Sequence, residues 1–375
     1  MNNKSIEKIT TNIAKIRTPL RLVSGKTLPQ YDLKYETYGE LNENKDNAVL
    51  ICHALSGNHH AAGKYQGDDK VGWWDNMIGP EKPIDTNKQF VVCLNNLGGC
   101  HGTTGPTSIN PETNKVYGSD FPIITVNDWV NSQKELMDYL DIPYWQFIVG
   151  GSLGGMQAFE WTLQFPLLVK NCIVIAAAPK LTAQNIAFNE IARQAIMKDP
   201  NWHDGNYLSK GVFPNHGLAL ARMLGHITYL SDASMKEKFG RDLKKSKLNF
   251  NYEVEFQIES YLRYQGEKFV TGFDANTYML MTKTLDYYDP IKDLSKSIKD
   301  RLGDSKSKYL IISFTSDWRF PPIRSKEIVK ILLDNENNVS YSEITADGGH
   351  DAFLMENKDY FDVMRSFIKE VDDGF

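Results

Sequence analysis

A serine flanked by glycines, lying between a strand pattern and a helix pattern, constrains the fold of this chain most strongly. The apolar run 145–149 predicts a buried strand, and the run 157–163 predicts a helix. Between them, Gly150, Ser152 and Gly154 form G-x-S-x-G, the pattern that holds a serine on a tight strand-to-helix turn. Glycine fills the flanking positions because side chains there would collide. We therefore predict that Ser152 is a nucleophile, exposed at the strand end beside free N–H groups of the next helix. A chance match to G-x-S-x-G need not lie between a strand pattern and a helix pattern, so this context favours the nucleophile.

The composition is typical of a large globular protein. The chain has 375 residues, 41% of them hydrophobic and 24% charged. A net charge of −5 predicts no broad basic face for nucleic acid, and no apolar run approaches the length of a membrane span. The first residues lack the apolar stretch of a signal peptide, and the four cysteines include no C-x-x-C pair. We therefore expect a cytoplasmic protein with free thiols.

Strand and helix patterns alternate along most of the chain. Predicted strands lie at 20–23, 31–38, 48–52, 90–94, 145–149, 172–178, 309–314 and 339–344, with helix patterns at about 125–139, 157–163 and 360–371. This order predicts an α/β fold with a mostly parallel central sheet and helices on both faces. Residues 1 to about 16 are polar, and we expect them to be frayed.

The segment 181–300 has a different pattern. It shows helix patterns at 186–197, 218–229, 253–264 and 275–286, and no convincing buried strand. We therefore expect a core domain made of residues 1–180 and 301–375, with a helical lid domain of residues 181–300 inserted over the site.

Two later strands end in residues that can complete a catalytic triad. In α/β-hydrolases the partners follow the serine in the order acid, then histidine. Asp317 follows the strand 309–314, and His350 follows the strand 339–344 and is the only histidine after the insertion. A neighbouring imidazole can activate the serine hydroxyl, and a carboxylate fixes the tautomer of that imidazole. We predict His350 as the base and Asp317 as the acid, with Asp347 as the competing acid.

The oxyanion hole is predicted from position alone. The expected donors are the backbone N–H of Leu153 and that of Leu55, in the loop after the strand 48–52. His53, His59 and His60 lie in that loop without an acidic partner at ligand spacing, so we expect supporting roles and no metal site.

Several segments together resemble one family. The chain is similar to the homoserine O-acetyltransferases, which have the α/β-hydrolase fold, over almost its whole length. The matching segments are His53-Ala54-Leu55-Ser56-Gly57, the Gly-rich loop Asn95–Pro106, Gly150–Gln157, Ala221-Arg222-Met223, Ile227-Thr228-Tyr229 and Gly348–Leu354.

The resemblance implies transfer of an acetyl group from acetyl-CoA to the hydroxyl of L-homoserine, a step towards methionine. It implies Ser152, Asp317 and His350 as the triad, and Arg222, Tyr229 and Asp351 as the residues that hold the amino acid. The reaction would proceed through an acyl-serine, with acetyl-CoA as a co-substrate and no cofactor. The family's lid also implies a homodimer through the helical insertion.

Alternative functions remain open at this stage. Homoserine O-succinyltransferases and serine O-acyltransferases share the fold, and an esterase or thioesterase would pass the acyl group to water. A non-catalytic binding module would not need an intact serine, acid and histidine. We expect acetyl over succinyl because the loop 54–56 offers no cation for a distal carboxylate, although an arginine elsewhere in the fold could reach in.

Overall fold

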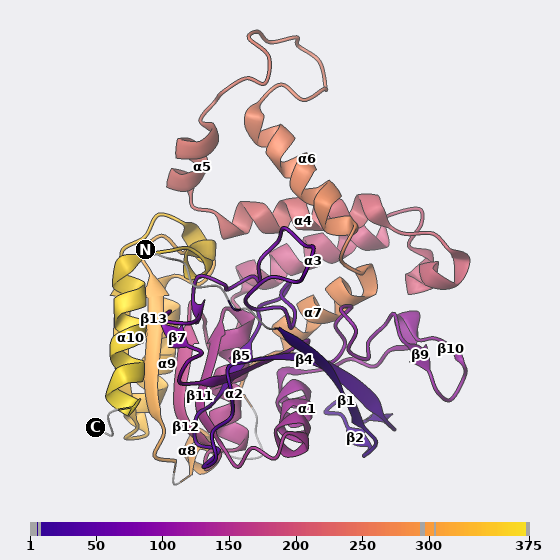
Figure 1. Cartoon of the computed structure of the whole chain (residues 1–375). Helices are drawn as coiled ribbons and strands as arrows, with labels where there is room; N and C mark the ends of the chain where they lie inside the picture. The colour runs from indigo at the N-terminus through magenta and orange to yellow at the C-terminus, as the bar shows by residue number, and fades with distance from the viewer. Residues whose placement is uncertain (1–5, 7–8, 293–296, 304, 373–375) are drawn as a thin grey trace.

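An eight-stranded sheet forms the centre of the computed structural model (Figure 1). The structure describes residues 6, 9–292, 297–303 and 305–372. In spatial order the strands are β1 (Thr10–Ile16), β4 (Tyr31–Tyr38), β8 (Phe90–Leu94), β5 (Ala48–Cys52), β11 (Trp145–Gly151), β12 (Val169–Ile175), β13 (Lys308–Phe314) and β14 (Asn338–Ile344). From β8 to β14 all neighbours are parallel, and β4 is antiparallel to both β1 and β8. The prediction of a mostly parallel sheet is therefore confirmed.

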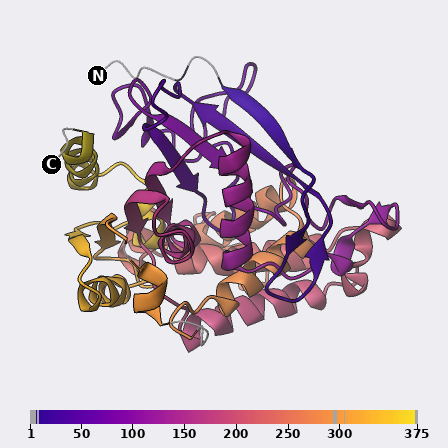
Figure 2. The same ribbon diagram turned by 90° about the horizontal axis from the view of Figure 1, so that it is seen from below.

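The central strands are buried on both faces, which explains their continuous apolar runs. In β5, Leu50 and Cys52 face one core cluster, and Val49 and Ile51 face the other. The first cluster is closed by α1 (Val126–Tyr139), α2 (Leu153–Gln164), α8 (Ile298–Leu302) and α9 (Pro322–Asp334). The second is closed by α10 (Lys358–Asp372) together with the loop that contains β6 (Ile78–Gly79) and β7 (Ile84–Asp85). Figure 2 shows α10 in yellow, apart from the other helices.

Five helices lie across the carboxyl ends of the parallel strands (Figure 1). They are α3 (Ala183–Met197), α4 (Asn215–Tyr229), α5 (Asp232–Phe239), α6 (Gln257–Val270) and α7 (Ala275–Tyr287), with the short helices η2 (His203–Gly205) and η3 (Tyr207–Lys210) between α3 and α4. The α4 helix packs against α3 and α6 and also touches η4 (Gly349–Leu354). All five fall within the predicted lid range 181–300. The α8 helix also begins inside that range, yet it packs on α2 of the core.

The remaining elements are small. Two-residue strands pair as β2 (Leu20–Arg21) with β3 (Thr27–Leu28) and as β9 (Ile109–Asn110) with β10 (Lys115–Val116), and η1 (Gly118–Asp120) precedes α1. Within the described residues, no helix is both long and apolar enough to cross a membrane.

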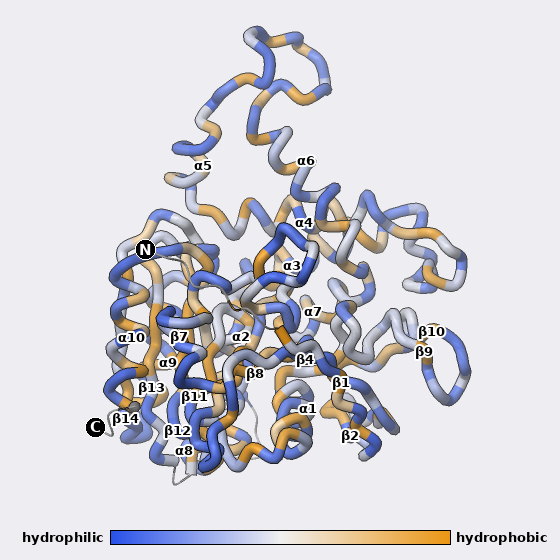
Figure 3. The backbone as a smooth tube through the Cα atoms, viewed as in Figure 1, coloured by the Kyte–Doolittle hydropathy of each residue, from blue (hydrophilic) through white to orange (hydrophobic). Residues whose placement is uncertain are grey.

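One sequence expectation is wrong. Residues 10–16 are not frayed but form β1, an edge strand whose side chains alternate between buried and exposed near its end. The strand was not predicted because its solvent-facing positions are polar and interrupt the apolar pattern. Polar residues are common on edge strands. Figure 3 shows hydrophilic and hydrophobic residues mixed along this edge strand.

Candidate active site

Ser152 lies on a strained turn between β11 and α2. Its φ is 57° and its ψ is −123°, a conformation that a non-glycine residue adopts only when its surroundings hold it there. A Cβ on Gly150 would lie 2.1 Å from the carbonyl oxygen of Gly154, and a Cβ on Gly154 would lie 2.0 Å from that of Cys52. The glycines of the G-x-S-x-G pattern are therefore required by close backbone approach, as the sequence predicted.

Three side chains predicted from separate parts of the sequence meet at this turn. The Nε2 atom of His350 lies 2.8 Å from Ser152 Oγ, and its Nδ1 atom lies 2.7 Å from Asp317 Oδ2. A proton on Nδ1 then donates to the carboxylate and leaves Nε2 free to accept the serine proton. All three side chains are buried. The arrangement can activate a serine hydroxyl for attack on a carbonyl carbon.

The acid of this arrangement is Asp317 and not its competitor. Its other oxygen, Oδ1, accepts hydrogen bonds from the backbone N–H groups of Arg319 at 3.0 Å and Phe320 at 2.9 Å. These bonds fix the carboxylate and leave Oδ2 for His350. Asp347, the competing acid, is exposed on the loop between β14 and His350. Its backbone carbonyl accepts a hydrogen bond from Ser231.

The predicted oxyanion donors belong to two segments that touch. Leu153 is the first residue of α2, where backbone N–H groups have no partner within the helix. The close approach of Gly154 to the Cys52 carbonyl brings the end of β5, and hence the loop that carries Leu55, against this first turn. Both leucines are buried. Their role in the oxyanion hole stays a prediction.

His53 holds that loop in place. Its Nδ1 donates to the carbonyl of Ala54 at 2.7 Å, and its Nε2 accepts from the backbone N–H of Asn96 at 3.0 Å. Burial lowers the pKa of His53 to about 4, so the ring is neutral at neutral pH and this tautomer is kept. The carbonyl of His53 accepts from the amide of Gln157, which lies on α2. The loop and the nucleophile helix are thus tied together by buried hydrogen bonds.

His59 and His60 face a different group. His60 Nδ1 lies 3.0 Å from an oxygen of Glu36, a fully buried carboxylate that also accepts from Tyr38 at 2.6 Å and from Tyr65. This acidic partner was not predicted because it comes from β4, a strand distant in sequence from the loop. In the described part of the chain, no cluster of histidine, cysteine, aspartate or glutamate has a geometry that could hold a metal ion.

The three residues expected to hold an amino acid lie around the mouth of the site. Arg222 of α4 donates to Ser56 Oγ at 3.3 Å, and its guanidinium lies 4.6 Å from the ring centre of Phe269. The Tyr229 ring is 6.2 Å from that of His350. Burial raises the pKa of Asp351, while the charges of His350 and Arg222 act in the opposite direction. Asp351 thus lies close enough to His350 and Arg222 for their charges to act on its carboxyl group.

A cleft opens beside Arg222. It has a volume of about 220 Å³ and is lined by Ser56, His101, Arg222, Gln265, Lys268, Phe269, Gly272 and Phe273. Lys268 and Arg222 make its wall basic.

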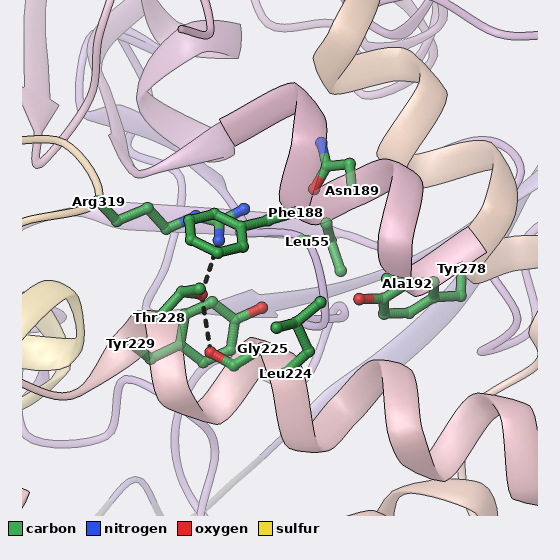
Figure 4. A pocket seen from close by; sticks show the side chains of 10 residues that line it. All are labelled: Leu55, Phe188, Asn189, Ala192, Leu224, Gly225, Thr228, Tyr229, Tyr278 and Arg319. Atoms are coloured by element: carbon green, nitrogen blue, oxygen red, sulfur yellow. Dashed lines mark hydrogen bonds between the residues drawn. The ribbon is translucent and has the colours of Figure 1, made fainter. Parts of the chain in front are cut away.

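Figure 4 shows a second, narrower pocket, which Tyr229 helps to line. Its lining residues are Leu55, Phe188, Asn189, Ala192, Leu224, Gly225, Thr228, Tyr229, Tyr278 and Arg319. The free space is only about 10 Å³, roughly that of one water molecule. An acyl chain can enter only if side chains move. Leu224 is a candidate to move because it is only partly buried.

Arg319 is a site residue that the sequence analysis missed. Its guanidinium donates from Nη1 to Thr228 Oγ1 at 2.7 Å and lies 5.6 Å from the ring centre of Tyr229. Among the described residues, its other side-chain N–H groups have no hydrogen-bond partner. The loop 54–56 itself offers no cation, as expected, and the arginine that the sequence left open comes from the loop that carries Asp317.

The fold and the buried serine, histidine and aspartate define the class of this protein. A family model described as alpha/beta hydrolase fold matches residues 47–356. Among solved structures, esterase E22 has a TM-score of 0.86 at 29% sequence identity, with 96% of this chain and 100% of that chain covered. The chain is an α/β-hydrolase-fold protein, as its sequence predicted.

Closer relatives place it within that class. Homoserine O-succinyltransferase of Hydrogenovibrio crunogenus is 61% identical over 365 residues, which cover 97% of this chain and 95% of the relative. The protein of the same name in Nitrosospira multiformis is 58% identical over 371 residues, 99% of this chain and 98% of the relative. Homoserine O-acetyltransferase from Bacillus anthracis has a TM-score of 0.85 at 29% identity, with 92% and 94% covered. The chain belongs to the homoserine O-acyltransferase family.

Proposed function

We propose that this chain is a homoserine O-acyltransferase of methionine biosynthesis that uses succinyl-CoA and releases O-succinyl-L-homoserine. The observation that carries the choice of donor is the buried guanidinium of Arg319 in the pocket beside the triad. A guanidinium has five N–H donors, and only one hydrogen bond from this side chain is made within the described residues. The others can bind a carboxylate bidentately, the strongest form of this contact.

Arg319 and the triad both lie near Tyr229. The centre of the Tyr229 ring is 6.2 Å from that of the His350 imidazole and 5.6 Å from the Arg319 guanidinium carbon. The carboxylate of a succinyl group is separated from the reacting carbonyl by two methylene groups, and in this proposal it extends into the pocket and pairs with Arg319. Without a partner, burying that carboxylate would cost several kcal/mol, on the order of the penalty for any isolated buried ion. Relatives more than half identical to this chain carry the succinyltransferase name, which agrees with this donor.

The reaction has two halves that use the same base. His350 takes the proton of Ser152 as its oxygen attacks the thioester carbonyl, and the N–H groups of Leu153 and Leu55 stabilise the oxyanion. The thiol of CoA leaves with that proton. His350 then takes the hydroxyl proton of homoserine, whose oxygen attacks the acyl-Ser152 carbonyl, and the proton returns to Ser152 as the ester is released.

Two charged residues distinguish a transferase from an esterase. Arg222 can bind the carboxylate of homoserine, Tyr229 can add a hydroxyl contact, and Asp351 can pair with the ammonium. An enzyme that passes the acyl group to water needs neither charge. The basic cleft beside Arg222 offers an entry for CoA, with Lys268 near its phosphates.

Acetyl-CoA is the second candidate donor. One observation favours it: the pocket has only about 10 Å³ of free space. An acetyl group is smaller than a succinyl group, so the pocket would have to open less to admit it. L-Homoserine remains the proposed acceptor with either donor.

The test compares donors and acceptors directly. Purified enzyme is mixed with succinyl-CoA or acetyl-CoA, with and without L-homoserine, while free thiol and the O-acyl product are followed. We expect a higher kcat/KM with succinyl-CoA and slow thiol release without homoserine. A higher kcat/KM with acetyl-CoA would overturn the donor. Equal thiol release with and without homoserine would make the protein a hydrolase.

A further inference from the structure

Thr228 is a fully buried threonine on α4 whose hydroxyl faces the guanidinium of Arg319 (Figure 4). Its Oγ1 donates to the backbone carbonyl of Gly225 at 2.8 Å and accepts from Arg319 Nη1 at 2.7 Å. Because a hydroxyl has a single proton, the bond to Gly225 leaves only lone pairs for the arginine. The direction of both bonds is therefore set by the helix.

The same turn of α4 supports the guanidinium from a second direction. The ring of Tyr229 lies 5.6 Å from the guanidinium carbon, within the range of a cation–π contact. A Cβ on Gly225 would lie 3.3 Å from the Tyr229 hydroxyl, so glycine at this position leaves room for the ring. The threonine fixes one edge of the planar guanidinium and the tyrosine supports a face.

Beyond this contact, the guanidinium N–H groups of Arg319 have no hydrogen-bond partner among the described residues, and Arg319 lines the pocket. Carboxylate binding by a guanidinium is bidentate and planar, so it depends on how the guanidinium is rotated. An arginine without its Nη1 partner keeps its charge but loses its fixed rotation. Loss of this contact would then lower kcat/KM for acyl donors with a distal carboxylate and leave kcat/KM for donors without one nearly unchanged.

We propose that Thr228 is a positioning residue for acyl-donor specificity, which holds Arg319 in the orientation that binds the distal carboxylate of the acyl group. This inference rests on the proposed succinyl donor. It assigns Thr228 no contact with substrate and no part in the triad.

The test is the ratio of kcat/KM for succinyl-CoA to that for acetyl-CoA in matched variants. Thr228→Val keeps the shape and removes the hydroxyl, and Thr228→Ser restores the hydroxyl. Thr282→Val is the matched control, because Thr282 is also fully buried on a lid helix and donates to a carbonyl one turn back, that of Met279, at 2.9 Å. Thr228→Ala provides a second hydroxyl-free variant if valine prevents folding.

We expect Thr228→Val to lower the ratio about ten-fold or more, the value of one hydrogen bond to a charged group, with acetyl-CoA use nearly unchanged. Thr228→Ser and Thr282→Val should keep the wild-type ratio. A folded hydroxyl-free variant with the wild-type ratio, or with equal losses for both donors, would overturn the inference and leave the succinyl donor standing. A wild-type preference for acetyl-CoA would overturn the donor itself, and the inference with it.

Discussion

At the scale of single residues, each polar group of the site has one role because its other hydrogen bonds are already used. Oδ1 of Asp317 accepts from the backbone, so Oδ2 is left for His350. His53 is neutral and uses both ring nitrogens on backbone groups. Arg319 differs from them, because most of its donors are unused within the described structure, and this is why we assign it to substrate.

Removal of the Arg319 charge should change the choice of donor. Arg319→Leu should lose roughly 2–5 kcal/mol of transition-state stabilisation with succinyl-CoA, because a buried carboxylate loses its partner. Arg319→Lys should lose less of this stabilisation than Arg319→Leu, because an ammonium keeps the charge but lacks bidentate geometry. Initial rates with both donors measure this. Equal rate losses with succinyl-CoA and acetyl-CoA would mean that Arg319 only supports the loop of Asp317.

Asp351 should make homoserine use sensitive to acid. Burial raises the pKa of Asp351 above its ordinary value of 3.8, so its charge is lost at a higher pH than for an exposed aspartate. As pH falls through this pKa, the KM for homoserine should rise, whereas acylation of Ser152 should not respond through this group. Asp351→Asn should show a high KM that no longer changes in that range.

The same shift predicts the stability of that variant. A raised carboxyl pKa means that the folded state binds the proton more tightly than the unfolded state, so the contribution of Asp351 to stability falls as pH rises through the pKa. Asp351→Asn should therefore keep or raise the Tm at neutral pH. A lowered Tm together with an unchanged KM would show that Asp351 is structural.

At the scale of elements, the site depends on the contact between the end of β5 and the start of α2. Gly154 is the point of closest approach, and an added Cβ would lie 2.0 Å from a backbone oxygen that cannot rotate away. Gly154→Ala should cost about 1–3 kcal/mol of stability, as overpacking usually does, and should remove most activity because the oxyanion loop shifts. Thermal unfolding and initial rates measure this. Wild-type activity in Gly154→Ala would contradict the required contact.

The elements that the sequence predicted are those with an unambiguous physical cause. Strands such as β5 and β13 are buried on both faces and so read as apolar runs, and the triad follows from the order of the loops at one sheet edge. The edge strand β1 was missed because half of it faces solvent. Arg319 was missed because no spacing rule joins it to Thr228, from which it is separated by most of the lid.

At the scale of the whole molecule, the lid covers the site and also extends away from it. The segment between α5 and α6 projects from the body of the protein (Figure 1). Phe250 on this segment is 89% exposed, and Tyr252 is fully exposed. Large exposed apolar surface can mark a site of protein association. We propose that these two aromatic side chains contact a second copy of the chain, in the homodimer that the family resemblance implies.

Loss of these aromatic groups should separate the copies. The double variant Phe250→Ser, Tyr252→Ser should sediment as a monomer where the native protein sediments as a dimer. Leu167→Ser is the control, because Leu167 is 70% exposed but lies between α2 and β12, away from the lid. A native protein that sediments as a monomer would contradict the proposed dimer.

The acyl-enzyme tests the central claim most directly. The native protein and Ser152→Ala are each incubated with succinyl-CoA alone, quenched in acid, digested and analysed by mass spectrometry. We predict one succinyl group on the native peptide that contains Ser152, none on the variant, and loss of the adduct when L-homoserine is added before the quench, with O-succinyl-L-homoserine formed in equal amount. No adduct at Ser152, or an adduct that homoserine does not remove, would contradict the account.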